Sequence, residues 1–196
     1  STPGLPGHVL VEDFLSPAEE AAVLAAVDGD AGNPWVPSTF NGAHLGKRWG
    51  VDMDLQARHV SPGERGMPEW LAFVAPRVRA AVPAGLLPPT AHAELERWSP
   101  TECNAIDYRR SEGHELRPHV DDRSLSNEVI ANLCLAGPCV MTYHAAGRAA
   151  VRVPLPRRAL QLQAGECRYK HTHAIANRDL KADRRVSVTF RQSPLT

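Results

Sequence analysis

The sequence has 196 residues, which is enough for one catalytic core preceded by an extension. Its 22 Lys and Arg residues balance its 22 Asp and Glu residues, which argues against a strongly basic surface that tracks phosphates. The sequence contains no apolar run of membrane-spanning length and no secretory signal. The four cysteines form no Cys-x-x-Cys pair, so we expect reduced, mostly buried thiols rather than a zinc cluster. We therefore expect an intracellular protein of the cytoplasm or nucleus that does not contact membranes.

The first half of the chain predicts a short strand and two helices. Residues 9–14 are apolar enough for the strand. Ser16 with Glu19 three residues later, and Pro17 between them, predicts a capped helix that runs to about Val27. A second helix is expected from Met67, with Pro76 either kinking it or shifting its start.

The second half predicts a series of short strands at the spacing of an all-β core. The expected strands are 93–98, 103–108, 116–120, 128–135, 139–144, 150–153, 158–163, 167–173 and 184–192. The expected fold is mainly β with flanking helices: a double-stranded β-helix, or jelly-roll, over residues 93–196. Residues 1–92 form an N-terminal extension whose two helices pack on one side. We expect one compact domain and a monomer.

The stretch 117–123 contains the most informative pair, His119 and Asp121. In an extended segment both side chains leave the same face, so an imidazole and a carboxylate can bind one divalent metal. A third ligand must come from elsewhere, and His171 and His173 lie downstream. Two histidines and one carboxylate form the facial triad of non-haem iron oxygenases. His-x-Asp alone is a weak signal, because a solvated charged pair explains most such pairs.

The strand expected at 184–192 has two different faces. Alternating positions place a polar set toward the barrel: Arg185, Ser187, Thr189 and Arg191. The other set is apolar and is expected to pack under a covering layer: Val186, Val188 and Phe190. A solvated strand face is the alternative interpretation of the two arginines.

From about residue 102 to residue 193 the chain resembles the AlkB family of Fe(II)/2-oxoglutarate dioxygenases, most closely its animal branch numbered four. The matching pieces are Cys103-Asn104, Asp107-Tyr108, Gly113, Pro118–Asp122, Val129–Leu133, Gly165, Arg168-Tyr169, Thr172–Ile175 and Arg184–Arg191. The element Gly46–Gly50 also resembles a short basic and aromatic segment that precedes the catalytic core in that family.

The resemblance implies a set of catalytic and cofactor-binding residues. His119, Asp121 and His173 would be the iron ligands and the catalytic centre, carried by two strands facing each other across the barrel mouth. His173 is preferred to His171 because it stands in the Thr-His-x-Ile context. The co-substrate 2-oxoglutarate would be held by Tyr108, Arg185, Arg191 and Asn132, with O2 as the second co-substrate. A planar guanidinium suits its far carboxylate.

The resemblance also implies oxidative N-demethylation. The expected substrate is a methylated nucleobase in DNA or RNA, such as N6-methyladenine, and the alternative is methyl-lysine in a protein. Residues 33–46 would form a lid that helps to choose the substrate. The candidate substrate contacts are Trp35, Phe40, Lys47, Arg48, Trp49 and Asp122. Core packing of the two tryptophans and a solvated Asp122 are the alternatives.

Two other classes compete with this hypothesis. A jelly-roll could bind a metal or peptide without turnover, but the complete triad and Arg185 favour an enzyme. A zinc hydrolase is disfavoured because no acid–base Glu accompanies the metal motif.

Overall fold

The computed structural model describes residues 1–54 and 56–193. The helices are α1 (Pro17–Gly29), α2 (Val74–Ala81), α3 (Pro89–Glu96) and α4 (Gly165–Lys170), with 3-10 turns η1 (Glu69–Leu71), η2 (Arg110–Glu112) and η3 (Asn177–Asp179). The early strands are β1 (His8–Val11), β2 (Val36–Ser38), β3 (Gly42–Trp49), β4 (Val51–Asp54) and β5 (His59–Pro62). The later strands are β6 (Glu102–Arg109), β7 (Glu115–His119), β8 (Ile130–Leu135), β9 (Cys139–His144), β10 (Val151–Leu155), β11 (Leu160–Gln163), β12 (Thr172–Ile175) and β13 (Arg184–Arg191).

Helix α1 begins where the sequence predicts. The Ser16 hydroxyl accepts from the Glu19 amide at 3.2 Å, and the Glu19 carboxylate accepts from the Ser16 amide at 2.8 Å. This capping box satisfies two amides that the helix itself leaves unpaired. The second predicted helix is divided: η1 comes first, and α2 then starts at Val74 with Pro76 in its first turn. Proline is tolerated there because those amides need no helical partner.

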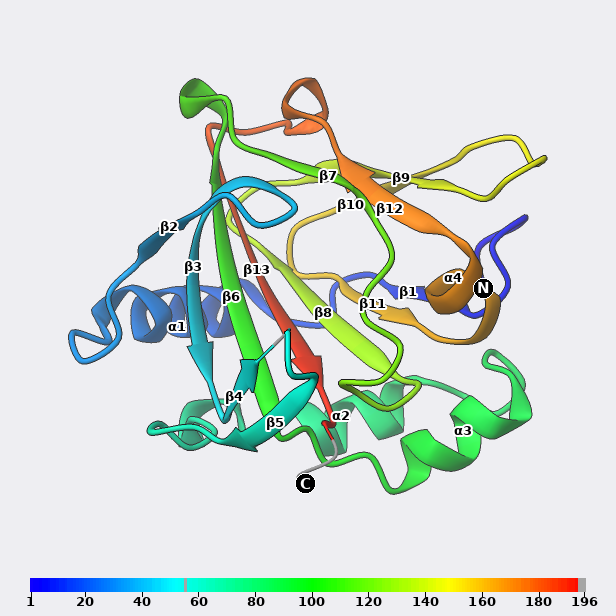
Figure 1. The fold of residues 1–196 in the computed structure, drawn as a ribbon, viewed down its shortest axis with the longest axis horizontal. Helices are drawn as coiled ribbons and strands as arrows, with labels where there is room; N and C mark the ends of the chain where they lie inside the picture. The colour runs from blue at the N-terminus through cyan, green and yellow to red at the C-terminus, as the bar shows by residue number, and fades with distance from the viewer. Residues whose placement is uncertain (55, 194–196) are drawn as a thin grey trace.

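Eleven strands form one antiparallel sheet that curls into a jelly-roll. Its order is β1-β11-β8-β13-β6-β3-β7-β12-β9-β10, with β2 paired to β3, and β4 and β5 form a separate hairpin. Strand β3 joins the two parts, because residues 45–49 pair with β6 while residues 42–43 pair with β7. Figure 1 shows the β7-β12-β9-β10 part lying above the β1-β11-β8-β13-β6 part. The predicted jelly-roll is therefore confirmed.

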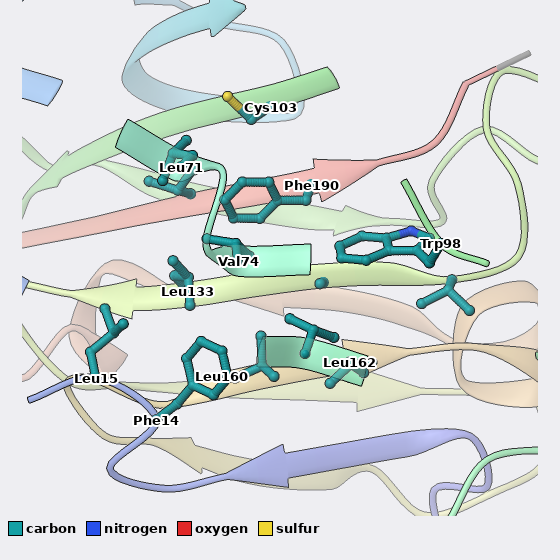
Figure 2. Close-up of a cluster of buried hydrophobic side chains, with 14 of the residues drawn as sticks. Phe14, Leu15, Leu71, Val74, Trp98, Cys103, Leu133, Leu160, Leu162 and Phe190 are labelled. Atoms are coloured by element: carbon teal, nitrogen blue, oxygen red, sulfur yellow. The ribbon is translucent and has the colours of Figure 1, made fainter. Parts of the chain in front are cut away.

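Three helices cover the outer face of the larger part of the sheet. Side chains of α1, α2 and α3 pack on strands β6, β8, β11 and β13 in one continuous core. Figure 2 shows its centre, where Phe190 of β13 lies among Leu71, Val74 and Leu133. The predicted apolar face of the last strand is buried here. A second core fills the space between the two parts of the sheet, and includes Tyr108 and Tyr143.

Two of the expected strands are wrong. Residues 93–98 lie mostly in α3, which begins with Pro89 and buries Ala91 and Leu95 against the sheet. Residues 167–173 begin in α4 and become strand β12 only at Thr172. Short helices of this kind carry too few apolar repeats to be separated from strands by pattern alone.

The N-terminal part is integrated into the same sheet as the rest. Strand β1 pairs with β11, and β3 pairs with β6, so residues before position 93 supply strands of the jelly-roll. The boundary at residue 92 remains a prediction. Among the described residues, none of the helices has the length and apolar character needed to cross a membrane.

We predict that Phe190→Ala lowers the free energy of unfolding by about 3–5 kcal/mol, because it removes a fully buried ring and leaves a cavity between β13 and the helices. Urea unfolding followed by circular dichroism measures this. The matched control is Phe40→Ala, whose ring is 61% exposed and which should change stability by less than about 0.5 kcal/mol. Equal losses in the two variants would contradict this account of the core.

Candidate metal centre and co-substrate pocket

His119 and His173 lie directly opposite each other on the paired strands β7 and β12. Their ring centroids are 4.3 Å apart. Asp121 follows β7 by two residues, and its Oδ1 lies 3.3 Å from Nε2 of His119 and 3.7 Å from Nε2 of His173. One ligand atom from each residue falls within 4.8 Å of the others, so the three could hold one metal ion. The two histidines come from hydrogen-bonded neighbouring strands, not from strands facing across the mouth as expected.

The surroundings orient one imidazole and keep the other neutral. Nδ1 of His119 lies 2.8 Å from the carbonyl oxygen of Arg117, so it donates there and leaves Nε2 free as a ligand. Burial lowers the pKa of His119, but Asp121 and the Arg117 carbonyl outweigh it and the pKa is raised. Burial lowers the pKa of His173 to about 4, so this imidazole is neutral, the form that binds metals. His171 is directed elsewhere, with Nδ1 3.0 Å from the Glu166 carbonyl oxygen.

Arg191 contacts the metal carboxylate. Its Nη2 donates to Oδ2 of Asp121 at 2.8 Å, and its Nη1 lies 3.5 Å from Oε1 of Glu102. Burial alone would raise the pKa of Asp121, but Arg191 and the two histidines hold it well below its usual value. The sequence predicted Arg191 as a co-substrate ligand. In the structure its guanidinium is instead engaged by two carboxylates, which favours a role in holding Asp121.

Arg185 has the environment expected of an anion-binding residue. It is 1% exposed and stands opposite Tyr108 in the β13–β6 register, with its guanidinium 5.4 Å from the ring centroid. Its Nε and Nη2 have no hydrogen-bond partner. A buried guanidinium with unused donors is costly unless an anion pairs with it. Asn132 lies on the same inner surface and donates to the Thr189 hydroxyl at 2.6 Å. The assignment of these residues to 2-oxoglutarate stays a prediction, with which the unused donors of Arg185 are compatible.

The loop that carries Asp121 is held by Arg168 of α4. This arginine is 2% exposed and donates to the carbonyl oxygens of Asp122, Ser126 and Asn127 and to the Ser126 hydroxyl. Asp122 contributes from within the loop, because its Oδ1 accepts from the amides of Ser124 and Leu125. Sequence reasoning gave Arg168 no role, although it stands in the motif that carries the resemblance. Its partners are backbone carbonyls, which no sequence pattern reveals.

Three of the candidate substrate residues pack where β3 meets the end of α1. Trp49 is 4% exposed in the helix-side core and donates to Asp30, while Lys47 donates to the Val27 carbonyl at 2.6 Å. Trp35 stacks under Lys47 at 5.0 Å. These side chains fasten the end of α1 to β3, which favours the core-packing alternative for the two tryptophans.

The other three remain on accessible surface. Phe40 is 61% exposed in the turn before β3. Arg48 lies 3.6 Å from Glu102, which links it to the metal centre through Arg191. Asp122 lines an open pocket of about 260 Å³ beside Asp121. The pocket is further lined by Arg58 and residues 120–124, and Arg58 was not anticipated.

No family model matches the chain. Among curated proteins, it is 29% identical over 176 residues to the Xenopus tropicalis tRNA (carboxymethyluridine(34)-5-O)-methyltransferase alkbh8, covering 88% of this chain and 26% of that protein. It is 29% identical to human alpha-ketoglutarate-dependent dioxygenase alkB homolog 4, and the match covers 95% of this chain and 67% of the human protein. The chain is therefore similar to AlkB proteins over most of its length. The predicted resemblance to this family is thereby confirmed. The chain spans about a quarter of the frog protein and two thirds of the human one.

Further comparisons agree with this similarity and with the fold. The AlkB-like chain is 23% identical to the Caenorhabditis elegans DNA N6-methyl adenine demethylase, covering 95% of this chain and 60% of that protein. The structure of OsALKBH1 matches with a TM-score of 0.70 at 18% identity, over 95% of this chain and 97% of that one. A Pseudomonas putida prolyl-4-hydroxylase matches with a TM-score of 0.62 at 13% identity, over 96% of this chain and 94% of that one. The solved structures share the fold of this chain. The alpha-ketoglutarate in the human protein's name is another name for 2-oxoglutarate.

Next to His173 lies a cluster of polar side chains that the sequence did not indicate, formed by Tyr143, Gln161, His8 and Thr2. The ring of Tyr143 lies 6.1 Å from that of His173, and its hydroxyl accepts from Gln161. His8 packs edge-on against Tyr143 at 5.5 Å, and its Nδ1 pairs with the Thr2 hydroxyl at 2.7 Å. Burial lowers the pKa of His8 to about 4. The imidazole is therefore neutral in the folded protein at neutral pH.

This burial predicts acid sensitivity. The unfolded chain binds a proton at His8 near pH 6.5, and the folded chain only near pH 4, so stability falls as the pH drops between these values. At pH 5 the residue's contribution is a loss of about 2 kcal/mol relative to pH 8. Urea unfolding at both pH values should show that His8→Asn loses about 2 kcal/mol less than the parent protein. An identical pH dependence in the two proteins would refute this assignment.

Proposed function

We propose that this AlkB-like protein is an Fe(II)/2-oxoglutarate-dependent dioxygenase that removes N-methyl groups from nucleobases in DNA or RNA, such as N6-methyladenine. The observation that carries the proposal is the grouping of His119, Asp121 and His173 within reach of one ion. This donor set of two nitrogens and one oxygen suits ferrous iron and leaves coordination positions for other ligands. The iron, 2-oxoglutarate and O2 when bound supply the oxidation of the methyl carbon.

The overall reaction balances with these components. The methylated amine, 2-oxoglutarate and O2 give the free amine, formaldehyde, succinate and CO2. The methyl C–H bond becomes a C–OH bond, and the resulting hemiaminal loses formaldehyde when its C–N bond breaks. The second oxygen atom enters succinate, while 2-oxoglutarate is oxidised and loses its carboxyl carbon as CO2.

The protein's own residues bind the co-substrate and orient the metal ligands. Arg185 offers unused donors to the far carboxylate of the co-substrate, and the Tyr108 ring lies beside its guanidinium. Both side chains are buried, so this ion pair forms out of water, where it is stronger. Arg191 holds one oxygen of Asp121 and thereby directs the other toward the histidines. Neutral His173 needs no deprotonation before a metal binds.

The open pocket beside Asp121 supports a nucleic-acid substrate. Arg58 and Arg123 line it. Asp121 and Asp122 line the same pocket, but the carboxylate of Asp121 faces the two imidazoles and that of Asp122 accepts from the amides of Ser124 and Leu125. The two arginines can therefore attract a phosphate backbone. Among the residues that the structure describes, none of those lining this pocket is aromatic, whereas proteins commonly recognise methyl-lysine with aromatic cages. The frog and worm relatives carry names that refer to tRNA and DNA, in line with this choice.

Substrate choice is tested by formaldehyde release. Purified protein with Fe(II), 2-oxoglutarate and O2 should release formaldehyde from single-stranded DNA or RNA containing N6-methyladenine, and Asp121→Ala should release none. The same assay is run with methyl-lysine peptides. Release from peptides alone would replace the nucleobase proposal with the protein-demethylase alternative. The absence of a visible charge-transfer band on anaerobic addition of Fe(II) and 2-oxoglutarate would reject the dioxygenase itself.

For the co-substrate, we predict that Arg185→Gln raises the half-saturating 2-oxoglutarate concentration about 10- to 100-fold, because charge-assisted hydrogen bonds worth about 1.5–3 kcal/mol are lost. Metal affinity, measured without 2-oxoglutarate, should stay unchanged. Arg152→Gln is the matched control, since Arg152 pairs with Asp179 on the opposite part of the sheet and is half-exposed. An unaltered 2-oxoglutarate requirement in Arg185→Gln would exclude the proposed pocket.

A further inference from the structure

Glu102, the first residue of β6, is a fully buried carboxylate with four polar partners. Its Oε1 accepts from the Asn104 amide at 2.6 Å, and its Oε2 accepts from the Ser193 hydroxyl at 3.2 Å. Its Oε1 also lies 3.5 Å from Nη1 of Arg191 and 3.6 Å from Nη1 of Arg48. A buried charge with this many partners is held in one place, because any movement would leave a partner unsatisfied.

Strand register explains why these groups meet. Arg191 of β13 stands directly opposite Glu102, and Arg48 of β3 stands opposite Asn104. Strand β6 lies between β13 and β3 in the sheet, so the carboxylate receives one cation from each side. The pairing is thus built into the sheet and does not depend on a loop.

Arg191 joins this carboxylate to the metal carboxylate. One terminal nitrogen faces Glu102, and the other donates to Oδ2 of Asp121 at 2.8 Å. The second oxygen of Asp121, Oδ1, is the one that faces the imidazoles of His119 and His173. The two oxygens of Asp121 therefore have separate tasks, and the position of Arg191 decides which oxygen does which.

We propose that Glu102 is a positioning residue for the metal centre: it fixes Arg191, which in turn reserves Oδ2 of Asp121 and leaves Oδ1 alone to bind the ion. The inference rests on the metal site of the proposed function. Glu102 also shares the positive charge of Arg191, which would otherwise act fully on Asp121 and oppose the binding of a cation. Groups that orient a metal ligand in this way change metal affinity or activity by about 10- to 100-fold when altered.

The test is a titration with Mn²⁺ alone, followed by the loss of the free-ion EPR signal, so that no turnover is involved. We expect Glu102→Gln, which keeps the shape and removes the charge, to bind Mn²⁺ about 10- to 100-fold more weakly than the parent protein. Asp13→Asn is the matched control, because it removes a carboxylate that pairs with Arg158 and is 78% exposed. It should bind Mn²⁺ as the parent does. Unchanged affinity in Glu102→Gln would overturn the inference.

A double variant shows whether the effect passes through Arg191. If it does, adding Glu102→Gln to Arg191→Gln weakens Mn²⁺ binding by less than about twofold beyond Arg191→Gln alone, since coupled residues are not additive. Fully additive losses would contradict the proposed path.

A surface variant covers the case in which Glu102→Gln does not fold, as judged by its thermal unfolding. Arg48→Gln changes a side chain that is 40% exposed and keeps the ion pair between Glu102 and Arg191. This variant should therefore bind Mn²⁺ no more weakly than the parent protein. Weakening of tenfold or more would contradict the inference. Failure of the parent protein to bind Mn²⁺ would overturn the proposed metal site itself. A parent protein that binds Mn²⁺ as tightly as the Glu102→Gln variant does would overturn only the role of Glu102.

Discussion

The antiparallel pairing of β7 with β12 sets the geometry on which the site depends. It places His173 opposite His119 although more than fifty positions separate them in the sequence. Neighbouring side chains on one face of such a pair stand close enough to share a ligand. A slip of one residue in this register would turn His173 to the other face of the sheet and dismantle the grouping. The strand pairing and the metal centre are therefore one structural feature.

The inner face of the larger part of the sheet is polar, and its charges are held in an ordered set. At one end of β13, Arg191 lies between Asp121 and Glu102; six residues earlier, Arg185 has donors with no partner. Arg191 thus pairs with carboxylates of the protein, whereas Arg185 keeps donors that an anion could use. The outer face of the same strand is buried under helices, whose packing keeps both arginines in register. Ligand geometry and core packing are linked through this strand.

Much of this could be predicted from the sequence, because the signals were local. The capping box of α1, the polar and apolar alternation of 184–191 and the His-x-Asp motif each depend on a few adjacent residues. The failures were of another kind. Trp49 was a candidate substrate contact, but it is buried against α1, because an aromatic in a basic segment has the same pattern in a core as at a site. Glu102 and Arg168 were missed because the groups that give them their roles, Arg191 and the loop of residues 122–127, lie far along the chain.

The most direct test of this account is the amount of ferrous iron that the purified protein binds under anaerobic conditions, measured by elemental analysis after gel filtration. We expect one iron per chain in the parent protein and in His171→Ala, whose imidazole contacts a backbone carbonyl instead of the triad. His173→Ala should retain almost none, although its fold is kept. Iron retained by His173→Ala, or lost from His171→Ala, would contradict the proposed centre.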